Sequence, residues 1–283
     1  MTEKEIPMGF GTMFKANRAY RAQKNGDTGE AIRLYEECFA EGLNDPRYVL
    51  SYAVLIIRDG QYQKAKDFLV KHQKAPGMTA DQKATLIVDY AACCFRLGEL
   101  DKAVRKLEEL YRKGASGLVY QTLGYLYVEQ FDAKRKAAFL ARETESQEQR
   151  DPALVMLEDP EGESGPKTLE QQWEAGRQKT LAFNREAIEY DDEDPVCLDN
   201  LGQTWYRVME DPAEAKPWFE KAHEIKPEQI DTLYFLSRYD LEAGDKAAAL
   251  EKLEKAAEGR YSPLNYCGKD QIEEEIRNLK EGA

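Results

Sequence analysis

Apolar residues recur three and four positions apart along most of the chain. One such segment runs from Ala103 to Leu110, and a nearly continuous apolar segment covers residues 48–57 and reads Tyr-Val-Leu-Ser-Tyr-Ala-Val-Leu-Ile-Ile. Because this spacing follows the period of the α-helix, it collects apolar side chains on one side of each helix. The hydrophobic pattern therefore predicts a succession of amphipathic helices that pack against one another.

A glycine followed five residues later by an alanine recurs between these helical segments. The pairs are Gly26 and Ala31, Gly60 and Ala65, Gly98 and Ala103, and Gly244 and Ala249. The first two pairs lie 34 residues apart, as do Ala215 and Ala249. Glycine readily ends a helix in the left-handed conformation, and a small alanine lets two antiparallel helices approach closely. This period predicts helix-turn-helix repeats.

Several helical segments share further residues. These are Tyr120-x2-Leu123-Gly124-x2-Tyr127, Leu198-x2-Leu201-Gly202-x2-Trp205 and Ala215-x3-Phe219-x2-Ala222-x4-Pro227. Together with the glycine and alanine pattern, these motifs resemble the tetratricopeptide repeat (TPR) family, and the resemblance covers about nine tenths of the chain. The resemblance implies an all-α fold, a right-handed α-α superhelix (solenoid) of about six TPR helix pairs with a C-terminal capping helix.

The resemblance also sets the expected repeat and domain boundaries. The six repeats fall near residues 12–45, 46–79, 84–116, 117–194, 195–229 and 230–262. The expected domains are N-terminal TPR repeats over 1–130, a charged insertion over 131–167, the rest of the repeats over 168–268 and a capping helix within 269–283. The capping helix is predicted from Lys269 to Leu279, beyond Pro263.

The fourth repeat is interrupted between its two helices. Its second helix, which contains Thr180 to Ala187, comes roughly 44 residues later than the family's spacing requires. Residues 131–148 read as a polar helix, and residues 151–165, with two prolines and two glycines, read as a loop. Thr168 and Gln171 have the spacing of a capping box, which predicts a long helix over 168–190.

Two interpretations of the insertion remain open at this point. Insertions in repeat proteins map to loops on one face, so this segment is either an arm that contacts a partner or a tolerated surface excursion. A longer loop costs little in stability, which makes the second interpretation reasonable. If the arm docks on a partner, Leu154, Met156 and Trp173 are the apolar residues expected to make the contact.

Composition and charge limit the classes of partner. The formal net charge is −13, and such acidity disfavours general binding to nucleic acid because both surfaces are negative. No segment approaches the roughly 20 apolar residues that span a membrane. The start of the chain, Met1 to Pro7, lacks the pattern of a signal peptide, so a cytoplasmic location and no membrane partner are expected.

The sequence contains no recognisable catalytic or metal-binding set. Its five cysteines form no CxxC pair, and adjacent Cys93 and Cys94 are interpreted as small core residues. Its two histidines, His72 and His223, have no second ligand at metal spacing. Nucleotide-binding and hydrolase motifs are absent from the sequence. We therefore expect no enzyme activity, no cofactor and no metal.

The resemblance implies a peptide-binding groove lined by the first helix of each pair. The residues at the groove positions are Asn17, Tyr20, Lys24, Arg47, Arg58, Asp89, Phe95, Arg96, Gln121, Tyr125, Asn200, Gln203, Tyr206, Arg207, Tyr234 and Arg238. Asn17 and Asn200 stand where related groove-binding members hold a peptide backbone, since an amide offers both a donor and an acceptor.

Four of the groove positions are basic and equivalent to one another in the repeats: Lys24, Arg58, Arg96 and Arg207. With the nearby aromatic residues they predict a groove for another protein or an extended peptide that is acidic or bears a carboxylate. The competing interpretation is that these long side chains are solvated and paired with neighbouring glutamates.

The function expected from these features is a protein- or peptide-binding TPR scaffold or adaptor. The alternative is a peptide-sensing regulatory protein whose superhelix changes shape when a ligand binds. The identity of the partner and the oligomeric state stay open.

Overall fold

The computed structural model describes residues 10–141 and 168–281, and within these ranges all regular structure is helical. The chain divides into two compact units, an N-terminal unit, Met1–Lys106, and a C-terminal unit, Leu107–Ala283. Helix α6 runs across the boundary between them.

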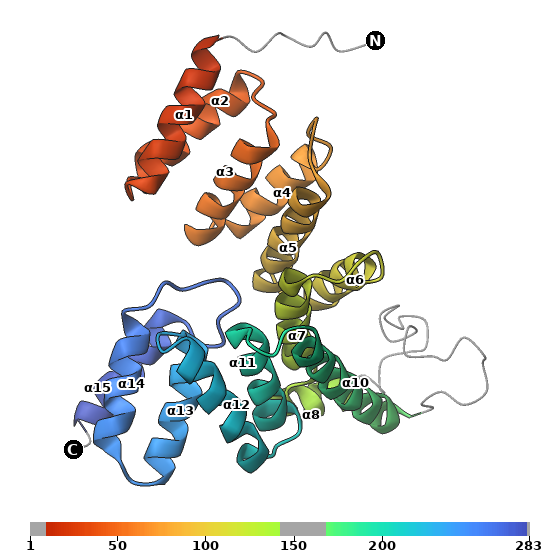
Figure 1. The fold of residues 1–283 in the computed structure, drawn as a ribbon, viewed down its shortest axis with the longest axis vertical. Helices are drawn as coiled ribbons and strands as arrows, with labels where there is room; N and C mark the ends of the chain where they lie inside the picture. Colours follow the sequence, from red (N-terminus) through yellow and green to blue (C-terminus); the bar gives the residue numbers. More distant parts are fainter. Residues whose placement is uncertain (1–9, 142–167, 282–283) are drawn as a thin grey trace. The chain divides into compact units, whose positions relative to one another are not determined.

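Antiparallel helix pairs build the N-terminal unit (Figure 1). Its helices are α1 Phe10–Lys24, α2 Thr28–Ala40, α3 Pro46–Arg58, α4 Tyr62–His72, α5 Ala80–Arg96 and the first part of α6 Leu100–Tyr111. Helix α1 packs against α2, and α3 packs against α4. The first helices of successive pairs also contact one another, α1 with α3 and α3 with α5.

The C-terminal unit repeats the same arrangement (Figure 1). Its helices are α7 Gly117–Phe131, α8 Lys136–Leu140, α10 Leu169–Tyr190, α11 Pro195–Gln203, α12 Pro212–Ile225, α13 Ile230–Glu242, α14 Lys246–Ala257 and α15 Lys269–Glu281. The pairs are α7 with α10, α11 with α12 and α13 with α14, and α15 packs against α14. The helix predicted from Lys269 is therefore present.

The predicted turns at the recurring glycines are confirmed. Gly26, Gly60, Gly98 and Gly244 have φ angles of 81°, 77°, 80° and 81°. In this left-handed region a side chain would be strained, which explains why glycine ends the first helix of these pairs. The alanines five residues on, such as Ala31 and Ala65, are fully buried where the paired helices meet.

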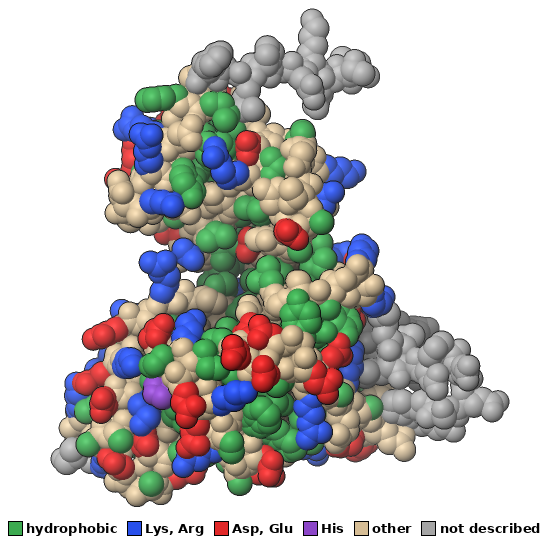
Figure 2. Space-filling model, in the orientation of Figure 1, with side chains coloured by type: hydrophobic (Ala, Val, Ile, Leu, Met, Phe, Trp, Pro, Cys, Tyr) green, Lys and Arg blue, Asp and Glu red, His purple; other side chains and the backbone are tan. Residues whose placement is uncertain are grey.

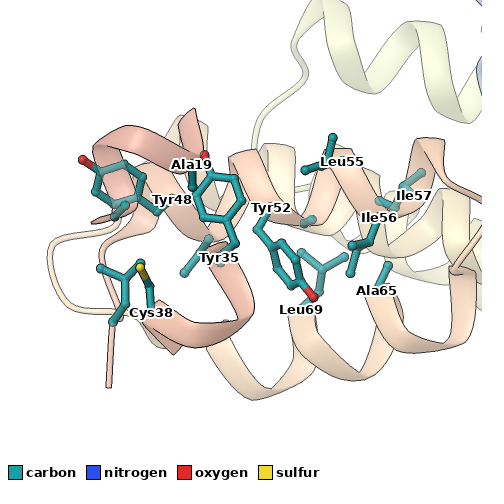
Figure 3. Packing of buried hydrophobic residues seen from close by; sticks show 14 of the residues in the cluster. Ala19, Tyr35, Cys38, Tyr48, Tyr52, Leu55, Ile56, Ile57, Ala65 and Leu69 are labelled. Carbon is teal, nitrogen blue, oxygen red and sulfur yellow. The ribbon is translucent and has the colours of Figure 1, made fainter. Parts of the chain in front are cut away.

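Aromatic rings fill much of the core of the N-terminal unit. Tyr35, Tyr48 and Tyr52 come from α2 and α3 and lie together among aliphatic side chains (Figure 3). The ring of Tyr35 lies 6.4 Å from that of Tyr48 and 5.7 Å from that of Tyr52. Cys93 and Cys94 are both buried and free, which confirms their interpretation as core residues.

The motif glycines of the C-terminal unit allow close helix packing. A Cβ atom at Gly202 in α11 would lie 2.7 Å from the ring of Phe219 in α12. A Cβ atom at Gly124 in α7 would collide with the side chain of Asn184 in α10. Both glycines are therefore required by the packing of each helix against its partner.

The start of the insertion differs from the prediction. Residues 131–148 were expected to form one polar helix, but α7 ends at Phe131 and a 3-10 turn, Ala133–Arg135, precedes the short α8. The break lies at Asp132, whose carboxylate accepts a hydrogen bond from the Lys134 backbone N–H at 2.9 Å. Residues 142–148 and the predicted loop at 151–165 lie outside the described residues.

The end of the insertion agrees with the prediction. Thr168 and Gln171 form the expected capping box, and α10 runs on to Tyr190. Trp173 is only 2% exposed, and its ring lies between Phe131 at 5.5 Å and Phe139 at 5.2 Å. Trp173 therefore belongs to the core and is not free to contact a partner. Leu154 and Met156 lie outside the described residues.

Helix α11 continues into a π-helical turn, Thr204–Val208. The backbone N–H of Met209 donates to the Thr204 carbonyl, five residues earlier, at 2.9 Å. Such a turn holds one residue more than an α-helical turn, so it changes the direction of the side chains within and after it. Arg207 lies within this turn.

Candidate functional site

The predicted groove residues of the N-terminal unit are accessible. We call Asn17, Tyr20, Lys24, Arg47, Arg58, Asp89, Phe95 and Arg96 the N-terminal inner face. They lie on α1, α3 and α5, the first helices of successive pairs. Of these residues, the exposed ones are Asn17, Lys24, Arg47, Arg58 and Arg96, and the half-buried ones are Tyr20, Asp89 and Phe95.

The basic residues of the N-terminal inner face form no ion pairs in the described ranges, as is also true of other exposed cations of this unit such as Lys71 and Lys74. Within residues 10–141 and 168–281, no ion pair joins Lys24, Arg47, Arg58 or Arg96 to an acidic side chain. Other bases of this unit are paired, for example Lys66 with Glu99. Of the competing interpretation, the pairing with neighbouring glutamates does not hold for Lys24, Arg58 and Arg96, whereas their solvation does, since all three are exposed.

Three of these cations instead lie over tyrosine rings. The Lys24 ammonium lies 5.3 Å from the Tyr20 ring centroid, and the Arg96 guanidinium lies 5.4 Å from that of Tyr62. The Arg47 guanidinium lies 4.3 Å from the ring of Tyr48. A cation in this position is attracted to the negative face of the ring, which favours its extended position without neutralising its charge.

The amide of Asn17 is partly used within the protein. Its oxygen accepts a hydrogen bond from the Tyr48 hydroxyl at 2.8 Å, and its nitrogen donates to the Met13 carbonyl at 3.1 Å. The side chain is exposed, and the amide nitrogen retains a second N–H. Asn17 therefore keeps one donor for a ligand.

Asp89 is the acidic member of the N-terminal inner face. Burial raises the pKa of its carboxyl to about 7, and the charge of Arg58 opposes this shift. Its Oδ2 atom is shielded from solvent, and no hydrogen bond from the described part of the chain reaches it. Asp89 is thus protonated in part of the molecules near neutral pH, which reduces its competition for the nearby cations.

The predicted groove residues of the C-terminal unit are mostly closed off. We call Gln121, Tyr125, Asn200, Gln203, Tyr206, Arg207, Tyr234 and Arg238 the C-terminal inner face. The buried members of this set are Tyr125, Asn200, Gln203 and Arg207. The others are half-buried, and the Arg238 guanidinium forms an ion pair with Glu275 of α15.

Arg207 is 6% exposed and is surrounded by acceptors. Its guanidinium donates to Asp132 at 2.9 Å, to the Gln203 side-chain oxygen at 2.7 Å and to Glu129 at 2.6 Å. Burial alone would lower the pKa of Arg207, but the charges of Glu129 and Asp132 hold it above its usual value. The prediction that Arg207 belongs to an accessible basic stripe is therefore wrong, because it is an internal ion-pair partner.

Asn200 also differs from its predicted use. It is 2% exposed, and its side-chain nitrogen donates to the Gln121 backbone carbonyl at 2.8 Å. The amide does hold a backbone group, but that group belongs to α7 of the same unit. Gln203 is fully buried and donates to Asp199 at 2.7 Å, so neither side chain is available to a ligand.

The 258–268 loop between α14 and α15 covers part of the C-terminal inner face. Its Tyr266 ring lies 4.1 Å from the Arg207 guanidinium and 5.6 Å from the Tyr234 ring. The carboxylate of Asp231, which is buried in α13, accepts a hydrogen bond from the Tyr266 backbone N–H at 3.1 Å. The loop therefore occupies positions that the resemblance assigns to a ligand.

The sequence interpretation missed Asp231 and Tyr266. One signal was present: Asp231 carries the only charge in the mostly apolar segment 230–237, and an acid there needs a polar partner when the helix is packed. A second signal was the presence of two tyrosines, Tyr261 and Tyr266, in a short linker.

Charge is divided unequally between the two units. Residues 1–106 contain 17 Lys and Arg residues and 14 Asp and Glu residues, a net charge of +3. Residues 107–283 contain 23 and 39 respectively, a net charge of −16. On the face shown in Figure 2, blue Lys and Arg side chains prevail around α1–α4, whereas red and blue side chains are mixed over α11–α14.

Metal binding and membrane crossing find no support in the described residues. No group of three or more His, Cys, Asp and Glu side chains in these ranges is arranged to hold a metal ion. None of the described helices combines the length and the apolar character that crossing a bilayer requires.

Comparison with known proteins identifies solved structures of similar fold. No family model matches the sequence, and no curated protein matches it. Among solved structures, TTC0263, a thermophilic TPR protein of Thermus thermophilus, superposes with a TM-score of 0.57 at 13% identity, covering 84% of this chain and all of the other. PilW, a type IV pilus biogenesis factor, superposes with a TM-score of 0.56 at 12% identity, covering 93% of this chain and 98% of PilW.

A third similar structure is human IFIT1, a dimer bound to m7Gppp-AAAA, with a TM-score of 0.58 at 14% identity. The match covers 94% of this chain but 54% of IFIT1, so this chain spans about half the length of that protein. These similarities extend over most of the described helices and agree with the helix pairs and glycine turns above. The chain is therefore an all-α solenoid with the fold of the tetratricopeptide repeat family.

Proposed function

We propose that the protein is a peptide- or protein-binding scaffold whose binding surface is the N-terminal inner face. Its ligand is an extended segment that carries several carboxylates. The observation that supports this proposal is the set of exposed cations, Lys24, Arg47, Arg58 and Arg96, which form no ion pair among the described residues and follow one another on α1, α3 and α5. In an otherwise acidic protein, such cations favour association with a negative ligand.

The arrangement of the cations suits an extended ligand. Lys24, Arg58 and Arg96 each lie at the C-terminal end of a first helix, in α1, α3 and α5. Because α1 contacts α3 and α3 contacts α5, the three cations follow one another across neighbouring helices. A chain with carboxylates at intervals along its length matches this row better than a compact ligand does.

A single-stranded nucleic acid is the rival ligand for a surface of cations and aromatic rings. Such proteins hold bases by stacking them on exposed aromatic faces. Here Tyr48 is fully buried, Tyr20 and Tyr62 are half-buried, and a cation already lies over each of the three rings. These rings are poor platforms for bases, which favours the acidic peptide.

The experiment compares two triple variants of the full chain. In the first, Lys24→Glu, Arg58→Glu and Arg96→Glu reverse the row of cations. In the control, Lys71→Glu, Lys74→Glu and Lys83→Glu reverse three exposed cations outside the N-terminal inner face, for the same change in net charge. The probe is a fluorescein-labelled peptide that alternates glutamate and glycine, and its binding is measured by fluorescence anisotropy.

We expect the first variant to bind the probe roughly tenfold more weakly or worse, since each exposed ion pair contributes about 0.2–1 kcal/mol and three are lost. The control should differ from the wild type by less than about threefold, as expected from long-range charge alone. Equal losses in both variants would show that only net charge matters and would reject the surface. Tighter binding of an RNA oligonucleotide of equal charge, lost in the first variant alone, would reject the ligand class.

A further inference from the structure

The 258–268 loop is bound to the C-terminal inner face in the way that a peptide is bound in a groove. Its Tyr266 ring lies 5.2 Å from the Phe235 ring and 4.1 Å from the Arg207 guanidinium. The Tyr266 hydroxyl accepts a hydrogen bond from the Lys134 ammonium at 2.8 Å. One tyrosine is thus recognised through its ring face and its hydroxyl.

The backbone next to this ring is recognised as well. Asp231 accepts hydrogen bonds from the Tyr266 backbone N–H, at 3.1 Å to each carboxylate oxygen, and from the Asn265 side chain at 3.2 Å. Recognition of a main-chain donor together with a neighbouring aromatic side chain is how proteins bind extended peptides. Asp231 and Phe235 come from α13, Arg207 comes from the π-helical turn that follows α11, and Lys134 comes from the 3-10 turn that follows α7.

The tip of the loop holds its own shape without the inner face. The Ser262 backbone N–H donates to the Asn265 side-chain oxygen at 2.6 Å, and the Leu264 backbone N–H donates to the Ser262 hydroxyl at 2.9 Å. The Asn265 backbone N–H closes the turn by donating to the Ser262 carbonyl at 3.2 Å. Such turns depend on residues a few positions apart, so these three hydrogen bonds do not need the inner face.

The site on the C-terminal inner face also contains two buried acidic side chains, and burying their charge is unfavourable. Asp231 and Asp199 are both buried, and burial together with the charge of Asp199 raises the pKa of Asp231 above its usual value. The hydrogen bonds from Tyr266 and Asn265 favour the charged form of Asp231. The loop therefore supplies hydrogen-bond donors to a carboxyl that is buried away from solvent.

We propose that the C-terminal inner face is a second peptide site, specific for a tyrosine, which the chain's own 258–268 loop occupies as an internal ligand. A partner segment that presents a tyrosine with a free backbone N–H replaces the loop and takes over the contacts with Arg207, Lys134 and Asp231. The loop thus keeps the site closed until such a segment is present. This proposal concerns the C-terminal unit and stands or falls independently of the acidic ligand of the N-terminal unit.

The first test uses a labelled peptide with the sequence of residues 262–268, in which serine replaces Cys267. Binding is measured to the wild type and to the double variant Asn265→Gly and Tyr266→Gly, which removes the two side chains through which the loop contacts Asp231, Arg207 and Lys134. A tethered ligand acts at an effective concentration near the millimolar range, so the wild type should bind the free peptide at least tenfold more weakly than the variant. Equal binding to both proteins, or no binding to a folded variant, would overturn the proposal.

Two control peptides define the chemistry. Alanine in place of the tyrosine should abolish binding to the double variant, whereas phenylalanine should weaken it severalfold by removing the hydroxyl that accepts from Lys134. The triple variant of Lys24, Arg58 and Arg96 should leave this binding unchanged. Tight binding of the alanine peptide would show that the tyrosine is not recognised.

The second test needs no variant and asks whether the loop leaves the site while the unit stays folded, which the proposal requires. Residue-resolved hydrogen exchange compares the Tyr266 amide with the amides of Phe235 and Leu236 in α13. If the loop opens while the unit stays folded, the Tyr266 amide exchanges at least tenfold faster than those of α13. Exchange of all three at the same slow rate would show that the loop is a permanent part of the core.

Discussion

The inner faces of the two units contain similar residues, but those of the N-terminal unit are mostly exposed and those of the C-terminal unit are mostly buried or half-buried. Arg96 and Arg207 stand at equivalent positions of their repeats, yet Arg96 is exposed with no carboxylate partner in the described ranges and Arg207 is 6% exposed between Glu129 and Asp132. The difference comes from what surrounds each arginine, since the two side chains are chemically identical. A repeat motif therefore specifies the position of a residue on its helix. It does not specify whether the side chain is exposed to solvent or packed against another part of the chain.

The largest expected difference in stability comes from replacing each of the two arginines. Arg207→Met leaves Glu129 and Asp132 without their cation in a poorly solvated position, and we expect the free energy of unfolding to fall by about 3–5 kcal/mol. The matched change Arg96→Met should alter it by less than about 0.5 kcal/mol, because Arg96 is exposed. Urea denaturation followed by circular dichroism measures both values. Similar losses in the two variants would contradict the assignment of different roles.

A smaller effect is expected from the contact between α11 and α12. Gly202→Ala places a methyl group 2.7 Å from the ring of Phe219, which is fully buried and stacked on Phe235, so the variant should lose about 1–3 kcal/mol. Gly29→Ala in α2 meets no atom within 4 Å and should be neutral or slightly stabilising, since alanine favours helices. Thermal unfolding of both variants gives the comparison, and an unchanged melting temperature for Gly202→Ala would show that the ring moves aside.

The smallest expected effect is pH-dependent and concerns Asp89. Its pKa of about 7 in the folded protein lies above the ordinary value of 3.8, so the folded state holds a proton that the unfolded state has lost. Ionisation of Asp89 therefore destabilises the folded state as pH rises from about 4 to about 7. We expect Asp89→Asn to be more stable than the wild type by about 1 kcal/mol at pH 8, with the difference shrinking towards pH 5.

The control for this measurement is Asp67→Asn, which changes an exposed carboxylate of the same unit. Its effect on the free energy of unfolding should stay within about 0.5 kcal/mol at both pH values. If Asp89→Asn and Asp67→Asn behaved alike between pH 5 and pH 8, the burial of Asp89 would not affect its ionisation.

Local features of the fold were predictable from the sequence because their causes are local. The helix periodicity, the left-handed glycines such as Gly60 and the capping box of Thr168 with Gln171 each depend on residues a few positions apart. The placement of the N-terminal inner face on the first helices of successive pairs was predictable too, since neighbouring helices in that unit follow the regular order of the repeats. Its use as a binding surface stays a prediction.

The state of the C-terminal inner face was not predictable in the same way. Arg207 is separated from Asp132 by 75 residues, and the Tyr266 that covers it follows three further helices, α12, α13 and α14. Their meeting depends on the interruption in the fourth repeat and on the loop after α14, neither of which the motif describes. The signal that was present, an acid at Asp231 in an apolar segment, indicated a buried partner but not which residue it is.

The π-helical turn at Thr204–Val208 changes how sequence position relates to position on the helix surface. A sequence alignment places Arg207 by its residue number. The side chains that it contacts depend on the helical turn in which it lies, and this turn contains one residue more than an α-helical turn. Removing one residue between Thr204 and Arg207 would restore an ordinary α-helical turn and rotate the residues beyond it by about 100°, the angle that one residue spans. The extra residue thus contributes to the direction of the Arg207 side chain toward Asp132 and Glu129. A variant of this repeat that lacks one residue here should therefore lose the buried ion pairs.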